Sequence, residues 1–196
     1  LTFVDYISPT VVANDITVVL GTTGVVSITP ADVDGGSDDN CPLTLSVDID
    51  TFNCANIGDV VVTLTGSDAA GNSASDTATV TVVDDMDPTV VTQDISVSLD
   101  ANGAASITTA DIDNGSSDNC TADADLTFAL DQTAFDCTHL ANNGVNTVTL
   151  SVTDEEGNVQ TGTATVTVVD SEDPTVTAQD IEVSLDANGA ATITTA

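Results

Sequence analysis

The side chains best suited to chemistry in this sequence are carboxylates, which gather where strand-like segments end. The chain of 196 residues has 32 Asp and Glu, one His and no Lys or Arg. In residues 79–90 an alternating Thr/Val run leads into three aspartates and then Pro88. Because Pro88 has no N–H to offer a sheet, regular pairing should stop before it. Similar joints recur at residues 165–176 and, in weaker form, at residues 1–11, so each joint ends one unit and begins the next.

These clustered carboxylates predict a site for a hard divalent cation. Two carboxylates about 4 Å apart repel by roughly 4 kcal/mol at an effective dielectric near 20, and no Lys or Arg can offset that repulsion. Hard cations take six to eight oxygen ligands, so Ca²⁺ is the expected cofactor. At the central joint the candidate ligands are Asp84, Asp85, Asp87, Asp111, Asp113, Asp118, Asn119, Asp154 and Asn158. The equivalent sets are Asp5, Asp32, Asp34, Asp38, Asp39, Asp68 and Asn72 before it, and Asp170, Glu172 and Asp173 after it.

Two simpler interpretations of the acidic residues remain open. The carboxylates could form a solvated surface suited to a salty medium, or Asp and Asn could only supply turns and caps. In either case nucleic acid and anionic lipid surfaces are poor partners, because both are repelled within the screening length of about 8 Å. No apolar run of about 18 residues is present, so direct membrane insertion is not expected.

Four cysteines form the second group of reactive side chains. Cys41 and Cys54 occupy places that match those of Cys120 and Cys137 in the next unit. This placing favours two local disulfides, Cys41 with Cys54 and Cys120 with Cys137, each stabilising its unit by about 3 kcal/mol. Free buried thiols are the alternative. A metal site of cysteines would need further soft ligands, and the single histidine, His139, lies in an insertion that the first unit lacks.

Catalysis is not expected from these residues. General acid and base catalysis needs carboxyl groups whose pKa values are driven apart in a pocket, which small Val- and Thr-rich units seldom provide. The sequence has no glycine-rich phosphate loop and no nucleophile elbow.

An internal repeat organises the whole chain. A shift of 79 residues superimposes Asp39, Asn40 and Cys41 on Asp118, Asn119 and Cys120, and short insertions raise the shift to 83 and then 86. The predicted division is therefore residues 1–4 as the last strand of a preceding repeat, 5–83 and 84–169 as two repeats, and 170–196 as the first strands of a truncated third.

Each repeat is expected to be an antiparallel β-sandwich of short strands. In the second repeat, strands are predicted at residues 95–99, 104–108, 126–130, 134–137, 147–153 and 159–169, the first two as a hairpin around Asn102-Gly103. No helical period of useful length appears, so the fold class is all-β, with tandem immunoglobulin-like repeats. Alternate strands run to opposite poles, which should bring the joint, the loop 110–120 and the turn 154–158 together at the N-terminal pole.

The closing half of each repeat resembles a known family. Residues 148–170, with Gly157-Asn158 between two Thr/Val strands, resemble the hyalin-type immunoglobulin-like repeat, and residues 61–84 do the same. Acidic repeats of this type are similar to those in giant surface adhesins of Bacteroidota that the type IX secretion system exports, including gliding adhesins and grappling filaments. The resemblance implies an extracellular location at the cell surface.

The function expected from these observations is structural. The chain would be part of a long adhesin or filament, stiffened by Ca²⁺, whose partners are further repeats of the same chain and a homo-oligomeric filament. The alternative is a carbohydrate- or protein-binding module. Loops tuned to a ligand should differ between copies, whereas here the polar loops match best, which favours the structural role.

Overall fold

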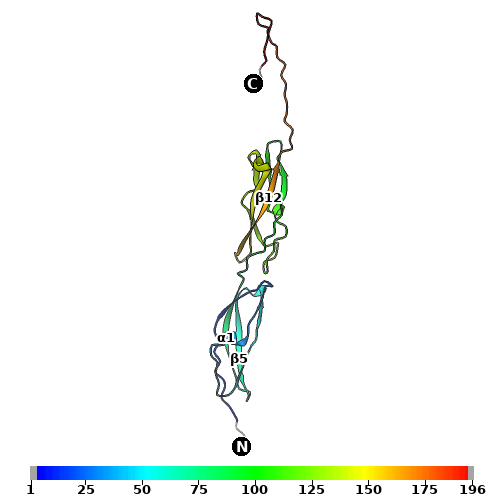
Figure 1. Ribbon diagram of the computed structural model, residues 1–196. Helices are drawn as coiled ribbons and strands as arrows, with labels where there is room; N and C mark the ends of the chain where they lie inside the picture. Colours follow the sequence, from blue (N-terminus) through cyan, green and yellow to red (C-terminus); the bar gives the residue numbers. More distant parts are fainter. Residues whose placement is uncertain (1–3, 194–196) are drawn as a thin grey trace.

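The computed structural model describes residues 4–193 and contains two β-sandwiches that follow one another along the chain (Figure 1). In the first sandwich the strands are β1 (Ile16–Val19), β2 (Val25–Ser27), β3 (Leu43–Val47), β4 (Thr51–Asn53), β5 (Gly58–Asp68) and β6 (Ser73–Val83). In the second they are β7 (Ile95–Ser98), β8 (Ala104–Ser106), β9 (Thr127–Leu130), β10 (Ala134–Asp136), β11 (Val145–Thr153) and β12 (Val159–Val169). The short helices are α1 (Pro30–Val33), α2 (Thr109–Ile112) and the 3-10 helices η1 (Cys54–Asn56) and η2 (Cys137–Gly144). Among the described residues no helix is long and apolar enough to cross a membrane.

Each sandwich combines a four-stranded sheet with a two-stranded one. The first has the order β1-β6-β5-β3 beside β2-β4, and the second has β7-β12-β11-β9 beside β8-β10. The predicted all-β fold with tandem sandwiches is confirmed. The pairing is not wholly antiparallel, however, because β1 runs parallel to β6 and β7 runs parallel to β12.

The predicted hairpin of residues 95–99 and 104–108 is wrong in its pairing. Its turn does form, with the N–H of Asp100 donating to the oxygen of Ala104 at 2.8 Å. The two strands then separate, since β7 joins β12 while β8 joins β10. A sandwich needs strands on both sides of its core, so the chain changes sheet at this turn.

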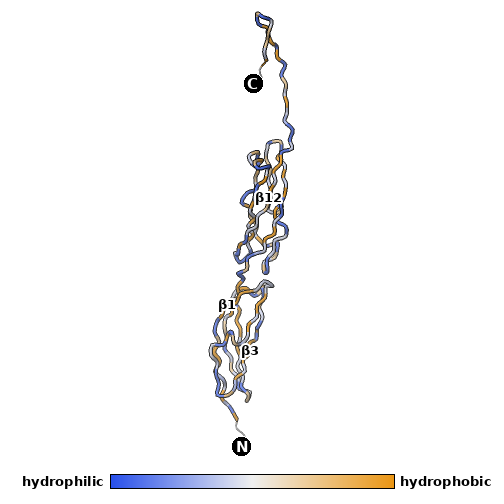
Figure 2. The backbone as a smooth tube through the Cα atoms, in the orientation of Figure 1, coloured by the Kyte–Doolittle hydropathy of each residue, from blue (hydrophilic) through white to orange (hydrophobic). Residues whose placement is uncertain are grey.

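Alternation of Val and Leu with Thr and Ser builds a thin core in each sandwich. In the second half of β5 and of β6 every other residue is buried while its neighbours are partly exposed. Figure 2 shows hydrophobic and hydrophilic residues mixed along the backbone of both sandwiches. Burying one Val or Leu side chain stabilises the fold by about 1.5–3 kcal/mol. The first core comprises Leu20, Ile28, Val33, Phe52, Val62, Leu64, Ala78, Val80 and Val82. The second comprises Leu99, Ile107, Ile112, Leu126, Phe135, Val148, Leu150, Val152, Ala164, Val166 and Val168.

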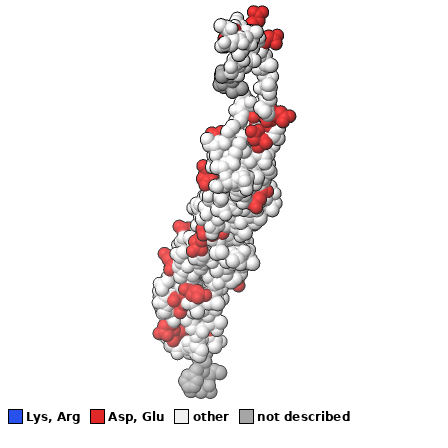
Figure 3. Space-filling view, turned by 45° about the horizontal axis from the view of Figure 1, so that its top comes forward, with Lys and Arg blue, Asp and Glu red and all other residues white. Residues whose placement is uncertain are grey.

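The two sandwiches lie end to end and form a rod, with the chain entering at one tip and leaving at the other (Figure 1). Acidic side chains are spread along the full length of the visible face, with no basic ones among them (Figure 3). Within residues 4–193 the repeats meet at their facing poles, where Asn119 contacts Gly21 and Cys54 is bonded to Cys120.

Residues 170–193 contain no strand, so the strands predicted for a third repeat do not form in this part of the chain. The strand β7, their equivalent in the second repeat, finds its partner about 70 residues later, as the Ser96–Thr167 hydrogen bond across 71 residues shows. A strand without such a partner is not stable in water. The local turn still forms, with the N–H of Asp186 donating to the oxygen of Ala190 at 2.8 Å. Residues 1–3, part of the predicted preceding strand, and 194–196 lie outside the described range.

Candidate metal centre at the joint between the repeats

The joint begins where the chain leaves β6 with Asp84, whose side chain is only 6% exposed. Its Oδ1 accepts hydrogen bonds from the backbone N–H of Met86 and from Asn119 Nδ2, both at 3.2 Å. Its Oδ2 is buried and has no hydrogen-bond partner among residues 4–193. Leaving a buried charged acceptor unpaired costs a few kcal/mol, so this oxygen is a strong candidate for a cation ligand.

The turn between β11 and β12 carries the second carboxylate, Asp154, to the same place. Its Oδ1 accepts from the backbone N–H groups of Gly157 and Asn158, both at 2.7 Å. Gly157 has φ of +95°, a conformation that side chains with Cβ rarely adopt, so the turn requires glycine here. The Asn158 amide donates to Asp154 Oδ2 at 2.8 Å and to the backbone oxygen of Asp84 at 3.2 Å. Asn158 therefore ties the turn to the joint.

Three carboxylates meet at this pole. One oxygen from each of Asp84, Asp154 and Glu156 lies within 4.8 Å of the other two. The pKa of Glu156 is raised by partial burial of its carboxyl group, and further by the charges of Asp154 and Asp84. At an effective dielectric near 20, the two buried carboxylates repel by roughly 3 kcal/mol. All donors are carboxylate oxygens, the ligand type that Ca²⁺ prefers, so the residues fit a hard cation.

Other predicted ligands lie close by without joining this cluster. Asp118 accepts from the N–H of Cys120 at 2.8 Å and of Thr121 at 2.9 Å, and its Oδ1 is buried and unpaired within the described chain. Together with Asp87 it lines a separate hollow of about 180 Å³. Asp85 is exposed. The structure thus gathers Asp84, Asp118, Asn119, Asp154 and Asn158 at one pole, as the strand directions predicted.

Two of the predicted ligands instead stabilise local structure in the second repeat. Asp111 Oδ2 accepts from the backbone N–H and the hydroxyl of Thr108, both at 2.7 Å, and so caps α2. Asp113 accepts from the N–H of Ser116 at 3.1 Å in a turn. In the first repeat Asp32 and Asp34 do the same work at Thr29 and Ser37. The contacts of these four carboxylates fit the simpler interpretation, in which Asp side chains stabilise turns and helix caps.

The N-terminal pole of the first repeat repeats part of this geometry. Asn72 donates to the backbone oxygen of Asp5 at 3.2 Å and to Asp68 Oδ2 at 2.8 Å, matching the bonds of Asn158. Asp39 and Cys41 lie beside Asp5, each offering one ligand atom within 4.8 Å of the others. Asp38, also predicted, is exposed and pairs through its backbone with Thr10. Ala69 and Ala70 stand in the places of Glu155 and Glu156, so the turn at this pole has two carboxylates fewer.

The third predicted set is not gathered by the described chain. Asp170, Glu172 and Asp173 are all exposed, and the one hydrogen bond recorded among them is from the N–H of Glu172 to Asp170 Oδ1 at 3.0 Å. In the second repeat the equivalent cluster needs the turn at Asp154, which follows about 70 residues after Asp84. The turn that would complete the third set is not among residues 170–193.

Glu156 is the cluster member that the sequence analysis missed. The signal for it was present, since the turn between the last two strands reads Asp-Glu-Glu-Gly-Asn in the second repeat and Asp-Ala-Ala-Gly-Asn in the first. The second copy has two acids, Glu155 and Glu156, where the first has alanines, and of these two Glu156 joins the cluster.

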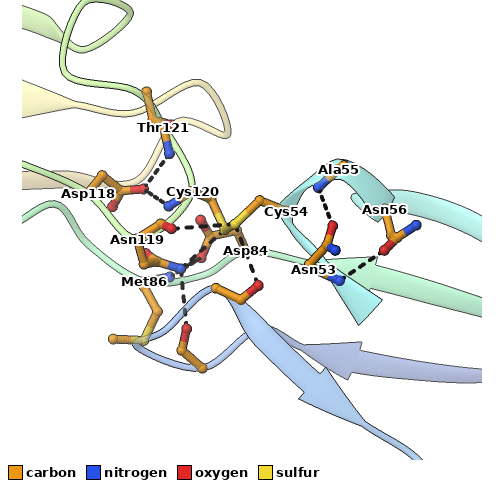
Figure 4. Close-up of a disulfide and its surroundings, with 12 residues drawn as sticks. Asn53, Cys54, Ala55, Asn56, Asp84, Met86, Asp118, Asn119, Cys120 and Thr121 are labelled. Carbon is orange, nitrogen blue, oxygen red and sulfur yellow. Dashed lines mark hydrogen bonds between the residues drawn. A yellow bond between two sulfur atoms is a disulfide. The ribbon is translucent and has the colours of Figure 1, made fainter. Parts of the chain in front are cut away.

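A disulfide joins the two repeats at this same pole, and it overturns the predicted pairing. Cys54 is bonded to Cys120, with a Cα–Cα distance of 5.2 Å and a sequence separation of 66 (Figure 4). Cys41 and Cys137 are free within the described chain. The two disulfides predicted inside the repeats, Cys41 with Cys54 and Cys120 with Cys137, are therefore wrong.

The direction of the strands explains why the pairing predicted from spacing fails. Between Cys41 and Cys54 the chain runs one way, first as β3 beside β5 and then as β4 beside β2. Leu43 pairs with Asp68 at the N-terminal pole, whereas Asn53 pairs with Val25 at the other. Twelve residues spanning a module in this way carry the two cysteines to opposite poles instead of closing a loop.

The disulfide is packed tightly between the repeats. The carbonyl oxygen of Asn119 lies 3.4 Å from Cys54 Sγ, and Asn119 Nδ2 donates to the oxygen of Gly21 at 3.4 Å. A Cβ on Gly24 would lie 2.6 Å from Cys54 Sγ and 2.9 Å from the Asn119 oxygen, so only glycine fits. The turn of residues 21–24 and the Cys54 segment thus cover the Asn119–Cys120 loop of the second repeat.

The contacts of His139 in the described chain lie within the second repeat. Its ring lies edge-on to Phe135, with centroids 5.3 Å apart, and its Nδ1 lies 2.9 Å from Asp136 Oδ1 at the start of η2. These contacts hold the 3-10 segment that follows Cys137.

Comparison with known proteins adds similarity of overall form. No family model matches the chain, and no curated protein matches its sequence. Among solved structures the chain is similar to human protocadherin-24 EC1-2, with 12% identity, 83% of this chain and 98% of that one covered, and a TM-score of 0.45. It is also similar to Drosophila N-cadherin EC1-4, with 13% identity, 84% and 50% coverage, and a TM-score of 0.45.

Proposed function

We propose that this chain is a structural segment of a long, repetitive extracellular adhesin or filament, in which β-sandwich repeats form a rod that Ca²⁺ and disulfides stiffen at the joints. The observation that carries the proposal is the joint itself. There an unpaired buried oxygen of Asp84 and a disulfide between Cys54 and Cys120 lie between two repeats whose cores are separate.

Calcium is the cation that the joint fits best. Bound there, it supplies positive charge without any chemical change. Asp84 Oδ2, Asp154 and Glu156 would hold it, while Asn158 and Asn119 keep the two aspartates in place through their amide hydrogen bonds. Since Asp84 belongs to the link between the repeats and Asp154 to the second repeat, a shared cation restricts bending at the joint.

The remaining parts of the proposal follow from the same design. The chain is not an enzyme, its partners are further repeats of the same chain and copies arranged side by side in a filament, and it does not bind nucleic acid. A disulfide is typical of proteins outside the cytosol, which supports a place at the cell surface. Export by type IX secretion in Bacteroidota is the route that the hyalin-type resemblance suggests.

The direct test compares the full chain in Ca²⁺ and in EGTA. Calcium should raise the melting temperature of the second repeat, because it binds the folded state alone. Small-angle scattering should give a straighter and less variable rod in Ca²⁺ than in EGTA. Magnesium at the same concentration is the control, since Mg²⁺ is smaller and gives up its bound waters reluctantly, whereas Ca²⁺ readily takes several carboxylate oxygens. An unchanged melting temperature and an unchanged scattering curve on adding Ca²⁺ would exclude the calcium joint.

A further inference from the structure

The free Cys137 has the surroundings of the paired Cys54. Both directly follow a short strand and begin a 3-10 helix. Cys54 Sγ lies 3.6 Å from the oxygen of Gly24, and Cys137 Sγ lies 3.9 Å from that of Gly103. A Cβ on Gly103 would lie 2.7 Å from Cys137 Sγ, much as one on Gly24 would meet Cys54. The C-terminal pole of the second repeat therefore has the same arrangement around Cys137 as the C-terminal pole of the first repeat has around Cys54.

The free Cys41 has the surroundings of the paired Cys120. The backbone N–H of Cys41 donates to Asp39 Oδ2 at 2.9 Å, and that of Cys120 donates to Asp118 Oδ2 at 2.8 Å. The preceding asparagine amide approaches the sulfur in each case, at 3.6 Å for Cys41 and 3.3 Å for Cys120. The first repeat therefore presents the other half of the joint at its N-terminal pole.

The pole around Cys41 is also open where the pole around Cys120 is covered. A hollow of about 530 Å³ is lined by Val4, Asp5, Asn40, Cys41, Pro42 and Ala70. In the second repeat the equivalent loop contacts Gly21, Gly24 and Cys54 of the first. At the observed joint, the C-terminal pole of the first repeat occupies the position that corresponds to this hollow. The hollow at Cys41 is therefore where the C-terminal pole of a preceding repeat would lie.

We propose that Cys41 and Cys137 are halves of two further inter-repeat disulfides. Cys137 would pair with the cysteine at the Cys120 position of a following repeat, and Cys41 with the cysteine at the Cys54 position of a preceding one. The proposal rests on the repetitive array proposed above. Its product is a continuous series of disulfides, one at each joint, in which every repeat is bonded to both neighbours.

The bond forms by ordinary thiol–disulfide exchange. The two thiols lose two protons and two electrons in forming the S–S bond, and a small disulfide oxidant such as oxidised glutathione accepts them and leaves as two thiols. One cysteine thiolate attacks the glutathione disulfide and forms a mixed disulfide with release of one thiol, and the thiolate of the partner cysteine then attacks that mixed disulfide and releases the second.

The test extends the full chain so that it carries a complete third repeat. Residues 174–196 match residues 88–110 in length, so a copy of residues 111–169 is appended after Ala196. The protein is oxidised with glutathione, alkylated, and cleaved with the protease Asp-N, because it contains no Lys or Arg for trypsin. Aspartates at 39, 50, 118 and 136 then place each cysteine of the original chain in its own peptide for mass spectrometry, and the appended copy carries the exposed substitutions Ala122→Val and Thr147→Ser so that its two cysteine peptides differ in mass from the originals.

We expect Cys137 to be joined to the added copy of Cys120, and its alkylation to fall about tenfold or more relative to the 196-residue chain. In the same molecules the Cys54–Cys120 peptide serves as the control for correct folding. A second version appends residues 84–169 directly after Val169, so that the third repeat has the sequence of the second apart from the same two mass-marking substitutions. The Cys137→Ser variant of either version should leave the added copy of Cys120 free.

Two results would overturn the proposal. One is a Cys137 that remains alkylated in either version while Cys54–Cys120 is formed. The other is a Cys137 joined to Cys41 or to its own copy. Disulfide mapping in both Ca²⁺ and EGTA separates this inference from the proposed function. The Cys137 disulfide can form even if calcium does not stiffen the joint, and calcium can stiffen the joint even if Cys137 stays free.

Discussion

The amide of Asn158 donates to the backbone oxygen of Asp84 at 3.2 Å, across 74 residues of sequence. The same bond joins Asn72 to Asp5 at 3.2 Å in the first repeat. Because one side chain fixes both the last turn of a repeat and the link that precedes that repeat, the position of the carboxylates is set before any cation binds. Predictions about the cation can therefore be made residue by residue.

Replacing Asp84 by Asn should change the stability of the second repeat in opposite directions with and without calcium. Asn keeps the acceptor that Met86 and Asn119 use, while it removes the charge that repels Asp154. In EGTA the melting temperature should rise, and in excess Ca²⁺ it should fall below that of the unchanged chain. The Asp85→Asn variant removes an exposed charge from the next residue and should show no such reversal. A fall in both conditions would mean that Asp84 stabilises the joint without a cation.

Exchanging residues at one turn position should transfer calcium affinity between the two poles. Glu156→Ala should weaken binding at the joint by about tenfold, or roughly 1.4 kcal/mol, because one of three carboxylates is lost. Ala70→Glu should strengthen binding at the N-terminal pole, where Asp5 and Asp68 already stand in the matching places. Isothermal titration calorimetry on both variants and the double exchange measures the effect. If neither variant alters affinity, Glu156 is not a ligand.

The two cores should unfold separately when their single large aromatic residue is removed. Phe52 is fully buried and Phe135 is 2% exposed, so Phe52→Ala and Phe135→Ala should each cost about 3–5 kcal/mol. Each should lower only the calorimetric transition of its own repeat. Val61→Ala, at a side chain that is 63% exposed, should change the stability by no more than about 0.5 kcal/mol. Equal loss in both transitions from one Phe substitution would show that the repeats unfold as one unit.

The stability of both repeats in EGTA should fall at acid pH below about 3.8. Backbone N–H groups of Thr149 and Thr63 lower the pKa of Asp131 and Asp48, respectively. A lowered folded-state pKa gives stability that is present above the unfolded value of 3.8 and is lost as the pH falls through the folded value. Asp131→Asn should remove part of this pH dependence in the second repeat, whereas Asp123→Asn, at an exposed loop acid, should not. Denaturant melts between pH 2 and pH 7 give the comparison, and identical slopes for both variants would contradict it.

The segment after the second sandwich should exchange its amide hydrogens far faster than the same sequence within a repeat. Residues 174–193 have the turn at Asp186 but no strand, whereas the matching turn at Asp100 leads into paired strands. Hydrogen exchange should therefore be fast in residues 181–185 and slow in β7. Protection of residues 181–185 in a sample shown to be monomeric would mean that the tail folds without further repeats.

Sequence patterns predicted the strands better than their partners. The range 159–169 predicted for the last strand is the range of β12, and residues 126–130 differ from β9 by one residue. The partners of β7 and β8 were missed because a local turn does not determine whether two strands share a sheet. That choice depends on covering a core whose other side is built about 70 residues later.

Sequence patterns predicted that carboxylates gather at the joint, but they did not predict which cysteines form the disulfide. Strand direction placed Asp84, Asp154 and Asn158 at one pole, because the acidic stretches follow strands that end there. Spacing alone could not give the pairing of Cys54, since twelve residues either close a loop or cross a module. Only the change of sheet between β3 and β4 shows that they cross it.

The disulfide between the repeats also determines how the chain carries tension. With Cys54 bonded to Cys120, residues 55–119 form a closed loop that a pull on the two ends does not reach. About 66 residues, or roughly 220 Å of extended backbone, are thereby withheld from stretching. If every joint is bonded in this way, the load passes only through the short segments that run from the first to the second cysteine of each repeat. Such a rod would keep its length when its sandwiches unfold. Reduction of the disulfides would then allow the unfolded chain to extend.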